Sequence, residues 1–110
     1  MSTATDGRRF EHTVRHNLEH DGYLCIRSAA SKGPADLIAF KKGQTLLVSC
    51  KNHPGVLPPR ERAALLHVAG LIDGVALHAY KPSRGRLAYR ELTGQGPGMW
   101  QPWTTDQVAR

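Results

Sequence analysis

The chain has 110 residues and a mass of 12.1 kDa, the size of one small domain. Its 15 lysines and arginines exceed its 9 aspartates and glutamates, so the net charge at neutral pH is +6. Ten of the 15 cations are arginine, whose planar guanidinium binds phosphate through two hydrogen bonds. This balance argues against an acidic-surface protein and favours a polyanionic partner, most often nucleic acid.

The composition excludes several other classes of protein. Apolar residues make up 40% of the chain, enough for a hydrophobic core, so general disorder is excluded. No apolar run approaches the roughly 20 residues of a membrane span, and residues 1–9 lack the apolar core of a signal peptide. Cys25 and Cys50 form no zinc-binding pattern. We therefore expect a cytoplasmic protein with no membrane partner and two reduced thiols.

The first predicted element is a helix between Asp6, a favourable N-cap residue, and Asp21. Phe10, Val14 and Leu18 recur at four-residue spacing and mark its buried face. The opposite face carries three histidines at the same spacing, His12, His16 and His20. Because this stripe lacks the glutamate and third ligand of a zinc hydrolase helix, we interpret it as solvated or DNA-facing.

Three strands are predicted next, over residues 23–28, 35–40 and 45–51. A loop of small residues over 29–34 joins the first two strands, and a tight turn at residues 42–43 pairs the second with the third as a hairpin. The second and third strands are largely apolar, which is typical of strands covered on both faces.

A second helix is predicted over residues 59–73, followed by strands over 75–80 and 86–92. The order α-β-β-β-α-β-β predicts an α/β sandwich built on one mixed, five-stranded sheet flanked by helices. We expect a single domain in which residues 1–93 form the functional unit and residues 94–110 form an irregular tail.

Polar residues at three positions interrupt the apolar strands. Asp36 lies at the start of the second strand, and Ser49 and Lys51 lie two apart on the third, so their side chains share one face. The hairpin can place Asp36 beside them, and Glu11 on the first helix can pack over this end of the sheet. Such carboxylates bind Mg²⁺, and a nearby lysine can position water or stabilise charge on a phosphate. The pattern indicates metal-assisted phosphodiester hydrolysis.

Each of these residues also has a structural interpretation. Glu11 could pair with Arg15 one helical turn away. Asp36 could be a turn residue after Pro34, and Lys51 could be a solvated charge at a strand end. The occurrence of all three in this order favours the catalytic interpretation.

Four segments in order resemble the PD-(D/E)xK nuclease superfamily, and within it the archaeal-type Holliday junction resolvases. They are residues 7–11 (GRRFE), 22–31 (GYLCIRSAAS), 35–40 (ADLIAF) and 47–51 (LVSCK). The resemblance covers roughly residues 7–93 and implies a restriction-endonuclease-like fold. It also implies an endodeoxyribonuclease that depends on Mg²⁺, with Mn²⁺ as a substitute. Such an enzyme cuts four-way DNA junctions and acts as a C₂ homodimer.

The resemblance also implies roles for individual residues. Glu11 and Asp36 would be metal ligands, with the backbone carbonyl of Cys50 as a further ligand. Lys51 would be the catalytic lysine, and Ser31 matches a loop serine near the scissile phosphate. The expected DNA-binding side chains are Arg8, Arg9, Arg27, Lys32, Arg60, Arg62 and Arg84.

Ser49 departs from the motif, which has an acidic residue at this position. Serine can hold a metal-bound water but adds no negative charge, so we expect weaker metal affinity. His53, beyond the strand, could be a local substitute ligand. Two alternatives stay open: a duplex DNA nuclease of the same fold, of restriction or repair type, or a catalytically weak protein that binds branched DNA. The origin, a prokaryotic cell or a phage-infected host, also stays open.

Overall fold

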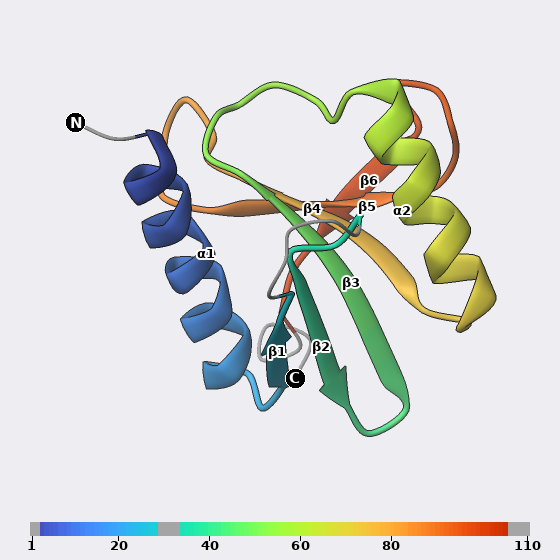
Figure 1. Cartoon of the computed structure of the whole chain (residues 1–110), viewed down its shortest axis with the longest axis horizontal. Coiled ribbons are helices and arrows are strands. Elements are labelled where there is room, and N and C mark those ends of the chain that lie inside the picture. Colours follow the sequence, from blue (N-terminus) through green and yellow to red (C-terminus); the bar gives the residue numbers. More distant parts are fainter. Residues whose placement is uncertain (1–2, 29–33, 106–110) are drawn as a thin grey trace.

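The computed structural model describes residues 3–28 and 34–105 (Figure 1). Two helices and six strands make up this part of the chain. They are α1 (Thr3–His20), β1 (Leu24–Arg27), β2 (Leu37–Lys41), β3 (Gln44–Lys51), α2 (Pro59–Leu71), β4 (Val75–Tyr80), β5 (Ala88–Leu92) and β6 (Trp100–Trp103). The predicted order is confirmed, with one strand added.

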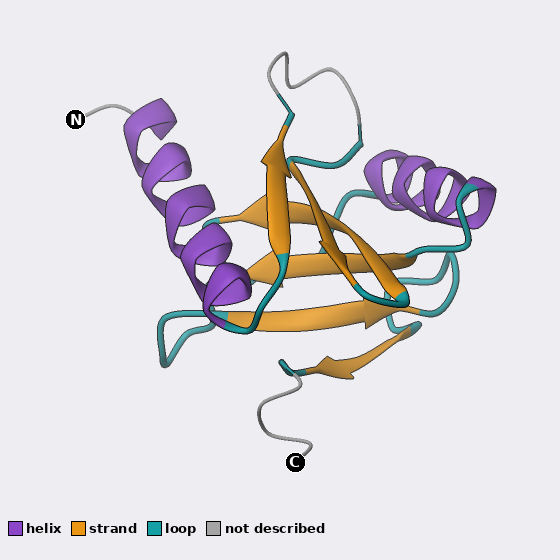
Figure 2. Cartoon of the chain, turned by 90° about the horizontal axis from the view of Figure 1, so that it is seen from below, coloured by secondary structure: helices purple, strands orange, loops and turns teal. Residues whose placement is uncertain are grey.

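The strands form one mixed sheet in the order β1-β2-β3-β4-β5-β6. The β3–β4 pair is parallel and the other four pairs are antiparallel. The parallel pair needs a long connection, and α2 provides it. α1 contacts β1, β2 and β3, whereas α2 contacts β3 and β4 on the other face of the sheet (Figures 1 and 2). The predicted α/β sandwich is confirmed.

The α1 face of the sheet holds the larger core. Phe10, Val14 and Leu18 are buried, which confirms the predicted stripe, and they belong to one cluster with Leu46 and Val48 of β3. The alternate residue Leu47 belongs to the cluster under α2, with Leu57, Leu65 and Ala69. β3 therefore contributes to both cores, as its nearly continuous apolar sequence predicts.

The expected five strands and irregular tail are wrong at Trp100–Trp103, which pairs with β5 as the sixth strand. Pro102 is compatible with this strand because β6 lies at the edge of the sheet. Trp103 packs against the α1-side core, with its ring centroid 5.1 Å from that of Tyr89 in an edge-to-face arrangement. Among the described residues, neither helix has the length and apolarity needed to cross a membrane.

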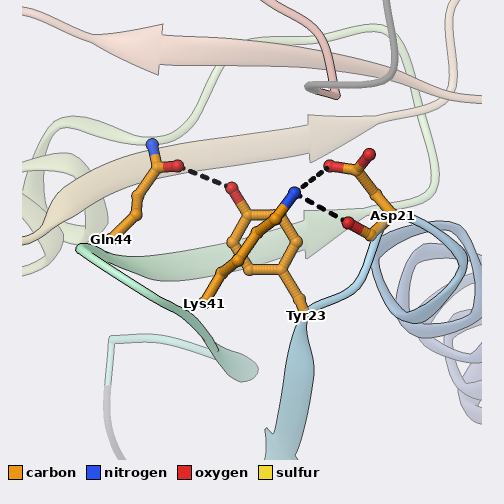
Figure 3. Close-up of polar contacts among 4 residues, drawn as sticks. All are labelled: Asp21, Tyr23, Lys41 and Gln44. Atoms are coloured by element: carbon orange, nitrogen blue, oxygen red, sulfur yellow. Dashed lines mark hydrogen bonds and ion pairs between the residues drawn. The ribbon is translucent and has the colours of Figure 1, made fainter.

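Polar contacts close the end of the sheet that carries the β2–β3 turn (Figure 3). Lys41 Nζ donates to the backbone oxygen of Asp21 at 2.8 Å and lies 3.4 Å from its carboxylate Oδ2. The Tyr23 hydroxyl donates to Gln44 Oε1 at 2.7 Å, and Lys41 lies over the Tyr23 ring. We call these four residues the turn-end cluster. It fixes the end of α1 to the hairpin.

Candidate active site

The start of β2 and the end of β3 meet at the opposite end of the hairpin, where Asp36 is held by three hydrogen bonds. Its backbone nitrogen donates to Val48 O at 2.8 Å, and its backbone oxygen accepts from Ser28 N at 2.9 Å. Its carboxylate Oδ2 accepts from the Cys50 backbone nitrogen at 2.7 Å. The Asp36 carboxylate is therefore fixed in place by the backbone of β3.

The surroundings of the Asp36 carboxyl disfavour its ionised form relative to a free aspartate. Partial burial raises its pKa above the ordinary value, and the nearby carboxylate of Glu11 raises it further. The Cys50 N–H bond and the ammonium of Lys51 act in the opposite direction without cancelling the effect of burial. Glu11 from α1 and Asp36, directly before β2, therefore lie close enough to repel each other, and a bound cation would relieve that repulsion.

Glu11 reaches this end of the sheet from α1. Its Oε1 accepts from Arg27 Nε at 3.1 Å, across the gap between α1 and β1. The alternative pair with Arg15 is not formed, because Arg15 binds Glu19 at 3.0 Å instead. The Arg27–Glu11 contact therefore joins α1 to β1. β1 pairs with β2, which follows Asp36, and β2 pairs with β3, which ends at Lys51.

The alternation along the end of β3 is as predicted. Cys50 packs against the core under α1, whereas Ser49 and Lys51 face α2. Ser49 is buried. Lys51 Nζ forms an ion pair of 2.8 Å with Oε1 of Glu61, in the first turn of α2. Sequence reasoning missed Glu61, because only the docking of α2 on β3 brings it to Lys51.

The oxygen donors at this site fit a hard divalent cation. Asp36 uses only Oδ2 for the Cys50 contact, which leaves Oδ1 available. In a strand the N–H and C=O of one residue point to the same side, so the carbonyl of Cys50 is directed toward Asp36. Within the described residues no three His, Cys, Asp or Glu side chains form a metal-binding group. The carboxylates of Asp36 and Glu11 and the Cys50 carbonyl are all oxygen donors, the ligand type that hard cations such as Mg²⁺ prefer.

The Cys50 side chain packs against the core under α1, on the face opposite Lys51. Burial and the neighbouring Asp36 carboxylate raise its pKa well above the ordinary value, so the sulfur stays protonated. Cys25 is also a free thiol, buried on β1. The prediction for Cys50 concerns its backbone carbonyl and does not depend on the thiol.

A groove of about 410 Å³ lies beside the site and carries three cations. It is lined by Arg9, Phe10, Thr13, Asn52, Lys81 and Arg86. We call it the basic groove. Asn52 and Lys81 directly follow the last residues of the parallel strands β3 and β4, Lys51 and Tyr80, which pair in register. The groove therefore opens at the same end of the sheet as Asp36.

The expected DNA-binding residues have different positions. Arg8, Arg9, Arg60 and Arg84 are exposed, and the half-exposed Arg27 holds Glu11. Ser31 and Lys32 lie outside the described residues. Sequence reasoning did not single out Lys81 and Asn52, although their position directly after two neighbouring strands is a signal that could have found them.

The prediction that Arg62 contacts DNA is wrong. Its side chain is only 3% exposed, and its guanidinium donates to Leu57 O at 2.7 Å and to Gln95 O at 2.8 Å. The charged run Arg60-Glu61-Arg62 suggested a solvated face, but only the structure shows that backbone carbonyls of two loops surround Arg62. Its hydrogen bonds anchor the loop before α2 rather than a phosphate.

A second buried arginine anchors the same loop. Arg90 of β5 donates to Gly55 O at 3.0 Å and to Pro54 O at 3.1 Å, with its guanidinium between the rings of Tyr80 and Trp100. His78 lies beside it, and burial together with the charge of Arg90 lowers the histidine pKa to about 4. The imidazole is therefore neutral at physiological pH, and residues 52–58 are held from two sides.

The fold and the site define a restriction-endonuclease-like α/β protein with a nuclease-type arrangement of carboxylates and lysine. The sequence model of the archaeal Holliday junction resolvase (Hjc) family matches residues 2–86. The chain belongs to this family.

Two known proteins agree with this assignment. One is a crossover junction endodeoxyribonuclease Hjc from Methanocaldococcus jannaschii, 49% identical over 45 residues. This match covers 41% of the chain and 33% of that protein, so it spans about a third of the relative's length. The other is the structure of Hjc from Archaeoglobus fulgidus, described as a Holliday junction resolvase from an archaeal hyperthermophile. It superposes with a TM-score of 0.72 at 21% identity, covering 94% of this chain and 95% of that one, which shows the same fold.

Proposed function

We propose that the chain is a metal-dependent endodeoxyribonuclease that resolves four-way (Holliday) DNA junctions by phosphodiester hydrolysis. The observation that carries this proposal is the meeting of Glu11, Asp36 and Lys51 at one end of the sheet, in a chain of this family. Both relatives named above are Hjc proteins, one an endodeoxyribonuclease and the other a junction resolvase.

Asp36, Glu11 and the Cys50 carbonyl are the residues that would hold Mg²⁺, for which Mn²⁺ would substitute. Bound there, Mg²⁺ supplies a more acidic water and neutralises charge on the scissile phosphate. The Cys50 N–H keeps the Asp36 carboxylate oriented. Lys51 is placed to hold the attacking water or to stabilise charge that develops on the phosphate.

The basic groove is the proposed path for the DNA backbone. Arg9, Lys81 and Arg86 line it from α1 and from the connection between β4 and β5, together with Asn52, the residue that follows Lys51. Such cations bind phosphates without reading bases, so recognition would depend on the shape of the junction. Affinity should fall steeply with salt because each neutralised phosphate releases counterions.

We also propose that the protein acts as a C₂ homodimer in the cytoplasm of a prokaryotic cell or of a phage-infected host. A four-way junction is nearly two-fold symmetric, and cutting two strands symmetrically requires two active sites. Leu24, Ile26 and Phe40 are exposed at 66%, 51% and 39%, and Leu24 is directly opposite Phe40 in the β1–β2 register. This apolar hairpin face is where a second copy would pack.

The dimer surface is tested by light scattering of two matched variants. Ile26→Glu should convert dimers into monomers, whereas Leu71→Glu, at a still more exposed apolar residue on α2, should leave them intact. Monomers of the wild-type protein at micromolar concentration would rule out the dimer.

The function is tested with a synthetic four-way junction and a linear duplex of the same arm sequence. Wild-type protein should cleave the junction with Mg²⁺ or Mn²⁺ and not without a metal. Asp36→Ala should bind the junction without cutting it, and Glu19→Ala, on the exposed side of α1, should cut normally. Equal cleavage of the duplex would instead identify a duplex nuclease. Binding without cleavage under any metal would identify a branched-DNA-binding protein.

A further inference from the structure

The face of β3 that carries Lys51 lacks a carboxylate of its own. Ser49, two residues earlier on the same face, stands where the nuclease motif has an acidic residue, and it is buried. The carboxylate beside Lys51 comes instead from Glu61, ten positions later in the chain, at 2.8 Å from Nζ. The negative charge next to the lysine therefore lies on the helix that packs on the strand, and not on the strand itself.

Glu61 is held in position by the backbone around it. The residue after it, Arg62, is buried and binds the carbonyls of Leu57 and Gln95. α2 begins at Pro58-Pro59, where the rings fix the backbone angle of the entry into the helix. The first turn of α2 is thus anchored relative to β3, and Glu61 projects from an anchored turn.

A second exposed ion pair, Arg15–Glu19, can be compared with the Lys51–Glu61 pair. Arg15 and Glu19 are 3.0 Å apart with similar exposure, but their side chains pair within one helix, one turn apart on α1. The Lys51–Glu61 pair joins the end of a strand to a different element, and the charge of Glu61 also acts on the Asp36 carboxyl. Of the two pairs, only this one connects residues of the site.

We propose that Glu61 is the positioning residue of Lys51 and replaces, from α2, the carboxylate that β3 lacks at Ser49. The inference rests on the proposed nuclease function. Glu61 fixes the ammonium at the end of β3, beside Asp36, where it meets the phosphate. Without Glu61, Lys51 would be a long, flexible side chain at a strand end with several rotamers of similar energy.

Kinetics on the four-way junction test this role. Glu61→Gln should lower kcat by about 10- to 100-fold with a change in KM of less than about twofold, as expected for a residue that orients a catalytic group. Glu61→Asp should recover part of the loss, and Ser49→Glu in the Glu61→Gln background should recover activity by returning the charge to β3. Glu19→Gln is the matched control and should leave kcat and KM unchanged.

Because Ser49 is buried, folding of the double variant is first checked by thermal melting. If it does not fold, the rescue is tested with Glu61→Asp alone.

Acylation of lysines read by mass spectrometry tests the same role without catalysis. Glu61→Gln should increase the modification rate of Lys51 relative to Lys81, and Glu19→Gln should not. If wild-type protein fails to cleave any junction, the nuclease proposal falls, while the labelling still tests the position of Lys51. A wild-type kcat in Glu61→Gln, or a loss of activity with unchanged Lys51 labelling, would overturn the inference.

Discussion

The two ends of the β2–β3 hairpin use the same residue types for different purposes. At the turn, Lys41 and Asp21 belong to the turn-end cluster, where the Asp21 side chain is only 2% exposed and receives Lys41. At the other end, Asp36 is close to Glu11 and Lys51, but the ammonium of Lys51 is bound by Glu61. In the turn-end cluster the carboxylate of Asp21 is paired with Lys41. At the candidate active site the carboxylates of Asp36 and Glu11 repel each other.

This difference separates a stabilising charge pair from a functional one. A buried carboxylate that receives a lysine gains most of the compensation it needs within the protein. Burial and, to a smaller extent, Glu11 raise the pKa of Asp36, and the ammonium of Lys51 does not offset them. Since Asp21 has a lysine partner and Asp36 keeps a raised pKa, we expect the two ends to respond to mutation in opposite ways.

The largest expected effect is a loss of catalysis at the candidate active site, at the end of β3. Lys51→Met should reduce junction cleavage by about 1,000-fold, about 4 kcal/mol of transition-state stabilisation, because a cation beside the phosphate is lost. The melting temperature should change little, since the Lys51–Glu61 pair is 30% and 45% exposed and such pairs contribute about 0–1 kcal/mol. Single-turnover cleavage and thermal melting measure the two quantities. A large loss of stability with normal cleavage would reverse the comparison.

The opposite result is expected at the turn. Lys41→Met should lower the free energy of unfolding by about 1–3 kcal/mol, because the buried Asp21 loses a charged donor. Cleavage by the folded variant should stay within about twofold of wild type, since the turn lies at the far end of both strands. Urea unfolding followed by circular dichroism checks the first statement. Lys42→Met, at an exposed neighbouring lysine, is the control.

The smallest expected effect is the pH dependence of Asp36. The pKa of Asp36 in the folded protein is raised above the ordinary 3.8. As the pH rises from 3.8 through the pKa of the folded protein, the unfolded chain ionises more readily than the folded one, so the free energy of unfolding falls. Asp36→Asn, which can still accept from Cys50 N, should therefore be more stable than wild type at pH 7 and lose this advantage below pH 4. Melting temperatures of both proteins across this range give the answer. An advantage that does not vary with pH would mean that ionisation is not its cause.

Much of this architecture follows from local patterns. The four-residue spacing of Phe10, Val14 and Leu18 predicted the buried face of α1, and strand alternation placed Ser49 and Lys51 on one face. Asp36 was recognisable because it lies beside a strand that is covered on both faces. A buried charge at such a position is costly unless another group compensates it. These inferences succeed because they depend on residues within a few positions of each other.

The features that were missed depend on contacts between distant segments. Glu61 and Arg62 are neighbours in a charged run, yet one reaches Lys51 and the other is buried against Leu57 and Gln95. No periodicity distinguishes them, because the difference arises from how the two loops pass the first turn of α2. The sixth strand escaped notice because the Gly- and Pro-rich segment around it is typical of irregular structure, and only pairing with β5 makes Trp100–Trp103 a strand.

The two buried arginines also bear on how much of the chain an active fragment must contain. Arg90 and the carbonyl of Gln95 lie beyond residue 86, where the family match ends, and both help to hold the loop between Lys51 and Glu61. A fragment cut at residue 86 would keep Glu11, Asp36 and Lys51 but lose these anchors. The segments after residue 86 thus hold the loop before α2 in place without supplying any of the proposed catalytic residues. We therefore expect an active fragment to need residues beyond the family motifs.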